Sequence, residues 1–285
     1  MIDVAFLDEL ERFDLALKKH SDELHEGEQT SGQTGQGMIF EDHKKYTPGD
    51  DIRRMDWKAY ARTNEYFIKR FEEEKSVTLH VLLDRSSSMD YGRVNKYDYA
   101  AKLGIGLAFM ASNTSDRYRF SVFSETVTDI SSARRSLNPR DLVDTLNTLD
   151  FTPESRFERC LSEYAEYIQN TSVVVVISDF LSSADDISRG VERMSDSDVV
   201  LVNVLDSTEL QPEWAGDTVL TDPESDSRLR TFLSGRVKQR YRSRLDEHID
   251  GVEAAAHEHG ARFVQVSTGT EFFDAFLDVW REVSR

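Results

Sequence analysis

Short runs of consecutive apolar residues constrain the fold of this chain more than any other feature of its sequence. Val173–Val176 is a run of four valines that Ile177 continues, and residues 77–83 and 199–205 are almost as apolar. A strand with one wet face alternates apolar and polar residues, whereas a strand covered on both faces does not need to. These segments therefore predict a parallel sheet with helices on each side, which is the doubly wound α/β class.

The rest of the chain alternates between strands and amphipathic stretches. Strands are predicted at 77–84, 117–124, 126–130, 172–179, 199–205 and 262–267. Helices are predicted at 96–112, 139–149, 155–169 and 184–195, then up to about residue 259 after a polar excursion that ends near 234, and from 271 onward. The result is a mostly parallel six-stranded sheet. In the common strand order 3-2-1-4-5-6, its first and fourth strands would be neighbours.

The first 75 residues are predicted as an extension, and residues 76–285 as the α/β domain. Within the extension, four apolar residues recur at spacings of four, three and four, which places them on one face of a helix. They are Phe6, Leu10, Phe13 and Leu17. The glycine-rich stretch that follows, up to Gly37, is predicted as a flexible loop.

Composition predicts a soluble globular protein of the cytoplasm. The chain has 285 residues, of which 39% are hydrophobic, and this is enough for a sizeable core. The single cysteine, Cys160, excludes an intramolecular disulfide and fits a reducing compartment. The first residues lack the basic and apolar regions of a signal peptide, and no apolar run is long enough to span a bilayer.

The strong negative charge narrows the range of partners. Asp and Glu outnumber Lys and Arg by 53 to 35, which gives a net charge of -18. Such a surface repels phosphate groups and disfavours binding to DNA or RNA, but it leaves basic protein partners open. The same surplus is typical of proteins adapted to molar salt, so we hypothesise a halophilic source.

Oxygen-bearing side chains follow two of the predicted strands. Asp84, Ser86 and Ser88 alternate in the loop after the first strand, and Asp179 ends the fourth. Because these strands are predicted neighbours, the two acids would face each other at the carboxyl edge of the sheet. Mg²⁺ prefers such oxygen ligands, so the pattern favours a metal site. The alternative is that the serines, and Asp179, cap the helices that follow.

This pattern resembles the metal-ion-dependent adhesion site of the von Willebrand factor A domain. That site uses an Asp-x-Ser-x-Ser loop, which Asp84, Ser86 and Ser88 match, and an Asp after the fourth strand, which Asp179 matches. Its second loop usually supplies a Thr after two glycines. Here the loop reads Thr152-Pro153-Glu154-Ser155, so Ser155 takes the Thr position and Thr152 is the fallback. The resemblance implies bound Mg²⁺, with Mn²⁺ or Ca²⁺ as alternatives.

A second segment, residues 46–63, is similar to the signature of the domain of unknown function fifty-eight family. It contains Gly49-Asp50-Asp51-Ile52-Arg53-Arg54-Met55-Asp56-Trp57 and precedes the α/β domain, as it does in that family. Relatives are commonly encoded beside MoxR-type AAA+ ATPases. The resemblance therefore implies an adaptor or co-chaperone that works with such an ATPase.

The signature segment is basic within an acidic chain. It contributes Arg53, Arg54, Lys58 and Arg62, with Trp57 among them. Mixtures of arginine and aromatic residues are typical of interface centres, so these five residues are predicted to bind a partner. The alternative, which we favour, is that Trp57 anchors the extension on the sheet and the arginines pair with nearby acids.

The main alternative function is a magnesium-dependent phosphohydrolase with Asp84 as nucleophile. Such enzymes generally carry a second acid two residues later, where this chain has Ser86. A serine cannot transfer protons near neutral pH without an adjacent base. His80 is expected in the core, and His257 and His259 do not share a helix face. The sequence therefore favours a non-enzymatic, metal-dependent protein-interaction module that recognises an acidic side chain of its partner.

Overall fold

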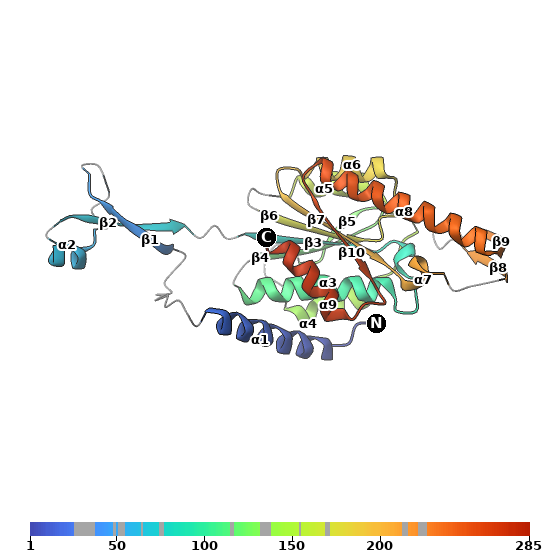
Figure 1. Ribbon diagram of the computed structural model, residues 1–285, viewed down its shortest axis with the longest axis horizontal. Helices are drawn as coiled ribbons and strands as arrows, with labels where there is room; N and C mark the ends of the chain where they lie inside the picture. Colours follow the sequence, from blue (N-terminus) through green and yellow to red (C-terminus); the bar gives the residue numbers. More distant parts are fainter. Residues whose placement is uncertain are drawn as a thin grey trace. The chain divides into compact units, whose positions relative to one another are not determined.

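A computed structural model describes residues 1–25, 38–47, 50, 55–63, 65–73, 77–114, 117–131, 138–153, 155–168, 172–212, 216–221 and 227–285. The predicted flexible loop lies outside these ranges. The chain divides into two compact units, one formed by Met1–Lys19 with Val77–Arg285 and the other by His20–Ser76 (Figure 1). Among the described residues, no helix combines the length and apolar character needed to cross a bilayer.

The larger unit is built on a six-stranded sheet. Its strands, from one edge to the other, are β10 (Arg262–Ser267), β7 (Asp198–Leu205), β6 (Ser172–Ser178), β3 (Thr78–Asp84), β4 (Arg117–Phe123) and β5 (Val127–Asp129). All neighbours pair in parallel except β4 and β5. Counted along the chain, this is the predicted order 3-2-1-4-5-6, so the doubly wound α/β prediction is confirmed and β3 lies beside β6.

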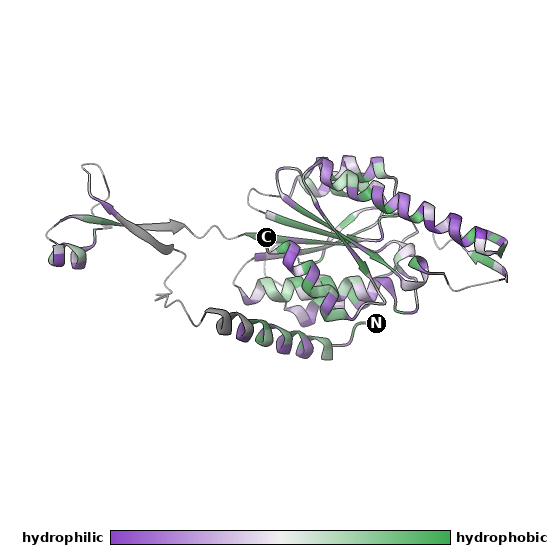
Figure 2. Ribbon diagram, in the orientation of Figure 1, coloured by the Kyte–Doolittle hydropathy of each residue, from purple (hydrophilic) through white to green (hydrophobic). Residues whose placement is uncertain are grey.

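Helices cover both faces of this sheet. One face carries α1 (Ala5–His25), α3 (Lys96–Asn113), α4 (Pro139–Asn147) and α9 (Phe272–Val283). The other carries α5 (Phe157–Ala165), α6 (Ala184–Glu192) and the second half of α8 (Gly235–Glu258). The central strands β3, β6 and β7 are mostly apolar in Figure 2 because helices cover both of their faces.

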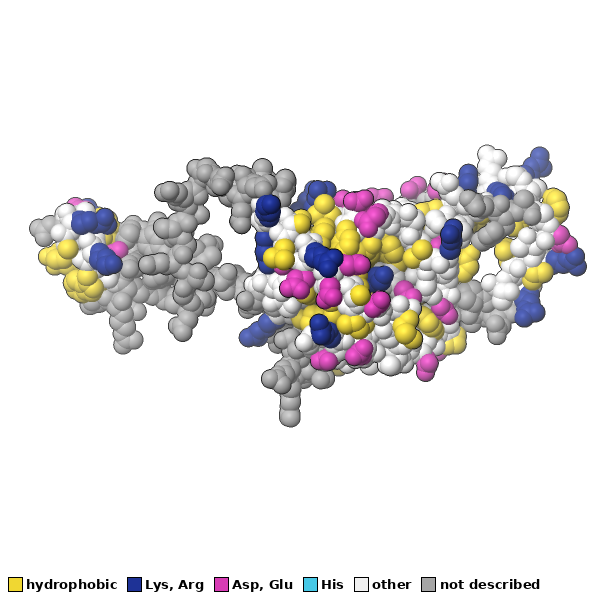
Figure 3. Space-filling view, turned by 90° about the horizontal axis from the view of Figure 1, so that it is seen from below, with side chains coloured by type: hydrophobic (Ala, Val, Ile, Leu, Met, Phe, Trp, Pro, Cys, Tyr) yellow, Lys and Arg dark blue, Asp and Glu magenta, His cyan; other side chains and the backbone are white. Residues whose placement is uncertain are grey.

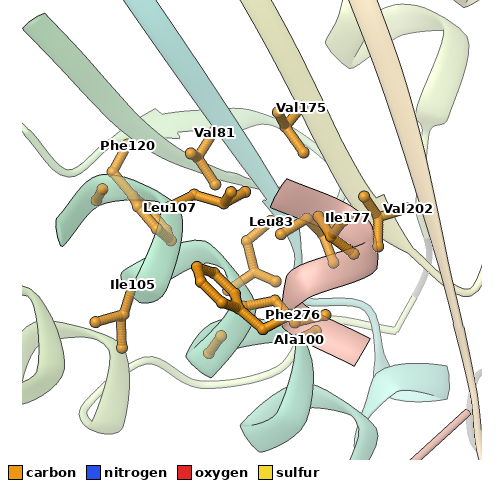
Figure 4. Packing of buried hydrophobic residues seen from close by; sticks show 14 of the residues in the cluster. Val81, Leu83, Ala100, Ile105, Leu107, Phe120, Val175, Ile177, Val202 and Phe276 are labelled. Atoms are coloured by element: carbon orange, nitrogen blue, oxygen red, sulfur yellow. The ribbon is translucent and has the colours of Figure 1, made fainter. Parts of the chain in front are cut away.

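The alternation of strand side chains supplies both layers of the core. Val175 and Ile177 face the layer of α3 and α9, while Val174 and Val176 face α5 and α6. Figure 4 shows Ile177 close to Phe276 of α9. The contact between α3 and α9 is tight, because a Cβ atom added at Gly106 would lie 2.6 Å from the Phe276 ring.

The first helix packs on the same layer, although the sequence predicted it as part of the extension. Leu10 is fully buried, and the Phe6 ring meets Phe272 edge-on with 5.0 Å between centroids. Phe13 stacks on Phe273 at 4.9 Å. The predicted apolar face of this helix therefore covers α9, and residues 1–19 belong to the α/β unit.

The smaller unit contains an antiparallel pair, β1 (Met38–Lys45) and β2 (Phe67–Glu73), and the short helix α2 (Trp57–Thr63). Tyr60 and Tyr66 stack with 4.6 Å between ring centroids. Trp57 meets Tyr60 edge-on but remains 61% exposed. The anchoring of the extension on the sheet by Trp57 stays a prediction.

The polar excursion before residue 234 contains structure that its sequence did not reveal. It holds α7 (Ser207–Leu210) and a second antiparallel pair, β8 (Gly216–Thr221) and β9 (Arg228–Leu233). These strands form a sheet of their own. Residues of β8 alternate between half-buried and exposed, whereas four of the six residues of β9 are exposed, and the pair leaves several apolar side chains in solvent.

His80 gives the fold a dependence on pH. It is 2% exposed on β3, as expected for a core residue, and its Nδ1 lies 2.9 Å from the Tyr164 hydroxyl. Burial, and then the charge of Arg119, lower the pKa of His80 to about 4. Between pH 6.5 and about 4, His80 is therefore protonated in the unfolded chain but neutral in the folded chain. The folded state loses stability as the pH falls through this range.

We expect this group to cost about 2 kcal/mol of unfolding free energy between pH 7.5 and 5. Urea unfolding of the wild type and of His80→Asn at both values measures it. The wild type should lose more stability than the variant on acidification. Equal losses in the two proteins would show that His80 does not titrate in this way.

Candidate metal centre

Two acids close neighbouring strands at the carboxyl edge of the sheet. Asp84 is the last residue of β3, and Asp179 directly follows Ser178, the last residue of β6. Because β3 and β6 pair in parallel, both acids lie at one edge, as predicted. They are only 1% and 3% exposed. Their burial requires partners, because an isolated carboxylate is costly away from water.

The loop after β3 is held by its own hydrogen bonds. The Ser86 amide donates to Asp84 Oδ1 at 2.8 Å, and the hydroxyls of Ser86 and Ser88 lie 3.0 Å apart. Both serines are buried. Ser86 precedes the short 3₁₀ helix Ser87–Met89 but makes no side-chain capping bond, and Asn95 caps α3 instead. The alternative in which these serines cap a helix is therefore wrong.

The turn after β6 sets the position of Asp179. Phe180 has a φ of 48°, a left-handed conformation that is uncommon outside glycine and costs backbone energy. The ring of Phe180 is buried, and its carbonyl lies 2.8 Å from His248 Nε2 of α8. Helix α6 begins later and is capped by Ser183. Asp179 is therefore not a helix cap, contrary to the second alternative.

The second loop of the site, which carries Thr152 and Ser155, lies beside the loop that follows β3. The Ser87 amide donates to the Thr152 carbonyl at 2.9 Å, and the Thr152 amide donates to the Arg85 carbonyl at 3.3 Å. The next turn brings in Ser155, whose buried hydroxyl has no hydrogen-bond partner among the described residues. A buried hydroxyl without a partner is unfavourable unless a ligand or water satisfies it.

These loops enclose one pocket of about 230 Å³. Every metal ligand predicted from the sequence lines it. The lining residues are Asp84, Ser86, Ser88, Ser155, Asp179, Leu181, Ser182 and Asp186. Thr152 does not line the pocket, although its hydroxyl is also buried and has no partner in the described part of the chain. The structure thus brings Ser155 rather than the fallback residue to the other four.

The two carboxylates affect each other's ionisation. Burial, and then the charge of Asp179, raise the pKa of Asp84 to about 7, against the opposing hydrogen bonds from Ser178 and Ser86. The Ser178 hydroxyl donates to Asp84 Oδ2 at 2.7 Å. A cation in the pocket would favour the ionised form and offset this repulsion.

Lys96 is a functional residue that the sequence analysis missed. It begins α3, is fully buried, and donates from Nζ to Asp179 Oδ2 at 2.8 Å and to Glu209 Oε1 at 2.9 Å. Burial alone would lower the pKa of Lys96, but Asp179 and Glu209 outweigh it and raise that pKa. The available signal was a lysine in the first turn of an otherwise apolar helix that begins near the predicted site.

The donor set fits a small hard cation. Two carboxylates and three hydroxyls offer only oxygen, which suits Mg²⁺, Mn²⁺ or Ca²⁺. Within the described part of the chain, no three His, Cys, Asp or Glu side chains gather as a metal cluster. Any cation held here would therefore depend on the serines as well as on Asp84 and Asp179.

The histidines and the cysteine that could act as catalytic or metal-binding groups do not belong to this site. His80 contacts Tyr164 in the core, and His259 Nε2 lies 2.8 Å from the Ser188 hydroxyl. Neither histidine lines the pocket. Cys160 is buried, and burial raises the pKa of its thiol to about 11, which makes it unreactive.

The residues predicted to bind a partner are only partly described. Trp57, Lys58 and Arg62 are exposed on α2. Arg53 and Arg54 lie outside the described residues. The described ion pairs of the smaller unit, Lys44 with Asp50 and Lys45 with Glu65, involve none of them.

Comparison with known protein families identifies the family of this chain. Residues 42–250 match the model of the protein family of unknown function DUF58. The chain belongs to the DUF58 family. The family match spans the signature segment, both acid-bearing strands and the first half of α8. This DUF58 protein has a von Willebrand factor A-like fold, with six strands in the doubly wound order and the site at the ends of the first and fourth.

The chain is similar to uncharacterized bacterial proteins and to solved structures. An uncharacterized protein of Mycobacterium bovis, Mb1516, is 23% identical over 76% of this chain and 70% of its own length. The uncharacterized protein YeaD of Bacillus subtilis is 33% identical over 25% of this chain and 20% of its own. An aerotolerance-related membrane protein of Bacteroides fragilis gives a TM-score of 0.49 at 13% identity, over 73% of this chain and 98% of that one.

Because the pKa of Asp84 is raised in the folded state, the stability of the metal-free protein should depend on pH. The protonated form of Asp84 is favoured on folding, so the stability that it contributes is present at acidic pH and is lost as the pH rises through about 7. In a chelator, we expect Asp84→Asn to melt several degrees above the wild type at pH 8 and above it by a smaller margin at pH 5, because part of the cost is already present once the unfolded carboxyl ionises. Thermal melts at both values measure this.

Added Mg²⁺ should reverse the order at pH 8, because only the wild type keeps both carboxylates. Glu163→Gln, on the exposed face of α5, is the matched control and should follow the wild type. A destabilised Asp84→Asn at pH 8 in chelator would contradict the assigned repulsion.

Proposed function

We propose that this DUF58 protein is a non-enzymatic interaction module whose binding to a partner protein depends on a divalent cation in the pocket. One observation carries the proposal: five oxygen-bearing side chains from three loops line one pocket, and the buried hydroxyl of Ser155 has no other partner among the described residues. A cation in the pocket would satisfy that hydroxyl.

The roles of the residues follow from their chemistry. The hydroxyls of Ser86, Ser88 and Ser155 would be direct ligands of Mg²⁺, while Asp84 and Asp179 would hold its waters and offset its charge. Mn²⁺ and Ca²⁺ are the alternatives. A bound cation with few direct carboxylate ligands supplies an electrophilic position that an acidic side chain of a partner can fill. Lys96 keeps Asp179 oriented and partly neutralised.

The partner is a protein that presents an acidic residue, and the family resemblance points to a MoxR-type AAA+ ATPase. In this role the protein is an adaptor or co-chaperone in the cytoplasm, a compartment that suits its single, buried cysteine. The halophilic source stays a prediction from composition, so binding should be measured in both dilute and molar salt.

Metal binding is the first test. We expect Ser155→Ala to weaken Mg²⁺ binding by roughly tenfold, which corresponds to about 1.4 kcal/mol, because one direct ligand is lost. Thr152→Val is the matched control and should bind as the wild type does. Isothermal titration at pH 8 measures both. Weaker Mg²⁺ binding in Thr152→Val alone would make Thr152 the ligand. Unchanged Mg²⁺ binding in both variants would show that the second loop supplies no ligand.

Partner binding is the second test. A pull-down compares wild type, Ser155→Ala and chelator-treated protein, with Thr152→Val as control. We expect the same AAA+ ATPase to be lost from the Ser155→Ala and chelator samples and retained in the others. A partner set that does not respond to either treatment contradicts metal-dependent binding.

The phosphohydrolase alternative is tested in parallel. Ser86 stands where that enzyme class has its second acid, so we expect no release of phosphate from a generic aryl phosphate. Magnesium-dependent release that disappears in Asp84→Asn would establish the enzyme instead.

A further inference from the structure

The pair β8–β9 and the first half of α8 form a projecting surface that the metal centre does not use. We call it the basic arm and define it as residues 216–221 and 228–244. We infer that the basic arm is a docking surface for an acidic, partly apolar segment of a partner protein. The inference does not depend on the metal centre.

Charge is the first observation. Residues 228–244 contain seven Lys or Arg and no Asp or Glu, in a chain whose net charge is -18. The seven are Arg228, Arg230, Arg236, Lys238, Arg240, Arg242 and Arg244. Arg230 pairs with Asp217 across the strands, and among the described residues the other six have no ion pair. Such a concentration attracts acidic groups within about 10 Å in ordinary salt.

Exposed apolar side chains lie among these charges. In the register of the pair, Val219 faces Arg230 and Asp217 faces Phe232, so both apolar residues lie on one face of the small sheet. Val219 is 55% exposed and Phe232 is 67% exposed. An exposed Phe between arginines is typical of an interface anchor rather than of a solvated hairpin.

The helix continues the same surface. Val237 and Tyr241, four residues apart on one face of α8, are 39% and 41% exposed. Arg236, Arg240 and Arg244 share an adjacent face of that helix. Figure 1 shows α8 extending past the sheet to the end that carries β8 and β9, and Figure 3 shows Lys and Arg side chains around hydrophobic ones at that end.

The arm is tied to the edge of the sheet that holds the pocket. Further along α8, His248 contacts the carbonyl of Phe180, next to Asp179. A protein that reaches the pocket could therefore meet the arm as well.

The chemistry of the arm favours a protein segment over nucleic acid or lipid. Phosphate-binding surfaces gain their affinity from many exposed cations, and the overall charge of this chain opposes the approach of a polyanion or an anionic bilayer. A short acidic segment interacts mainly with the nearby positive charges of the arm, because salt screens the negative charges farther away. Its apolar residues can also cover Phe232 and Val219, which a phosphate backbone would leave in water.

The test uses a fluorescent peptide in which Glu alternates with Leu, and a second peptide in which Gln replaces every Glu. Fluorescence anisotropy is measured in chelator, so that the metal centre takes no part. We expect the acidic peptide to bind more tightly than the neutral one. The triple variant Arg236→Gln, Arg240→Gln, Arg244→Gln should weaken the acidic peptide by roughly tenfold, because exposed ion pairs are individually weak.

Matched controls separate the arm from general charge and general hydrophobicity. Arg12→Gln, Arg281→Gln, Arg285→Gln removes three exposed arginines elsewhere and should bind as the wild type does. Phe232→Ser should weaken binding, whereas Leu15→Ser, which alters a side chain 61% exposed on α1, should not. Circular dichroism confirms that each variant is folded.

Several outcomes would overturn the inference. Equal binding of the two peptides, or equal loss in the arm and control variants, removes the role of the arm. Tighter binding of duplex DNA or of phosphatidylserine vesicles through the same arginines assigns the arm to a polyanion. Self-association of the wild type that the arm variant abolishes assigns it to a second copy of this chain.

Discussion

The structure depends on the burial of β3 and β6 side by side, with helices on both faces of each. A charged side chain in the middle of a buried strand would be costly, because it would be removed from water on both faces of the sheet. The acids of such a strand therefore lie where it ends. Parallel pairing puts those ends at the same edge. Asp84 and Asp179 therefore come together without any local sequence signal between them, and the loops that follow must satisfy two buried carboxylates.

Three kinds of group meet that demand. Hydrogen bonds from the Ser86 amide and the Ser178 hydroxyl stabilise Asp84, and the Lys96 ammonium stabilises Asp179. The left-handed turn at Phe180 keeps Asp179 at the pocket, and the buried ring of that residue and the contact of its carbonyl with His248 hold the turn in place. The site is thus supported by α3 and α8 as well as by its own loops.

The sequence predicted the parts of this arrangement that follow from periodicity. The strand order, both acids and the face of α1 that includes Leu10 came from apolar spacing and from the rule that parallel strands end at one edge. Ser155 came from a family pattern rather than from spacing. The first-turn position of Lys96 was a weak signal, but its ion pairs could not be predicted, because the partner of a buried lysine is set by helix placement and not by neighbours in the chain.

The pair β8–β9 shows a different limit. Its residues read as polar loop because the apolar side chains that would mark a strand, such as Val219 and Phe232, are few and exposed and do not reach the core. Periodicity detects an element by the face that it buries, so an element whose face is exposed gives a weak signal. The basic arm was missed for the same reason that makes it available to a partner.

The charges around the pocket argue for a divalent cation. Asp84, Asp179 and Glu209 would carry three negative charges against the single positive charge of Lys96. Burial, and then the charge of Asp179, raise the pKa of Asp84, so in the metal-free protein a proton on Asp84 relieves part of the surplus. A monovalent ion would leave part of that surplus, whereas a divalent ion neutralises it and frees Asp84 to ionise. The same groups that destabilise the empty fold near neutral pH thus define the ion that would stabilise it.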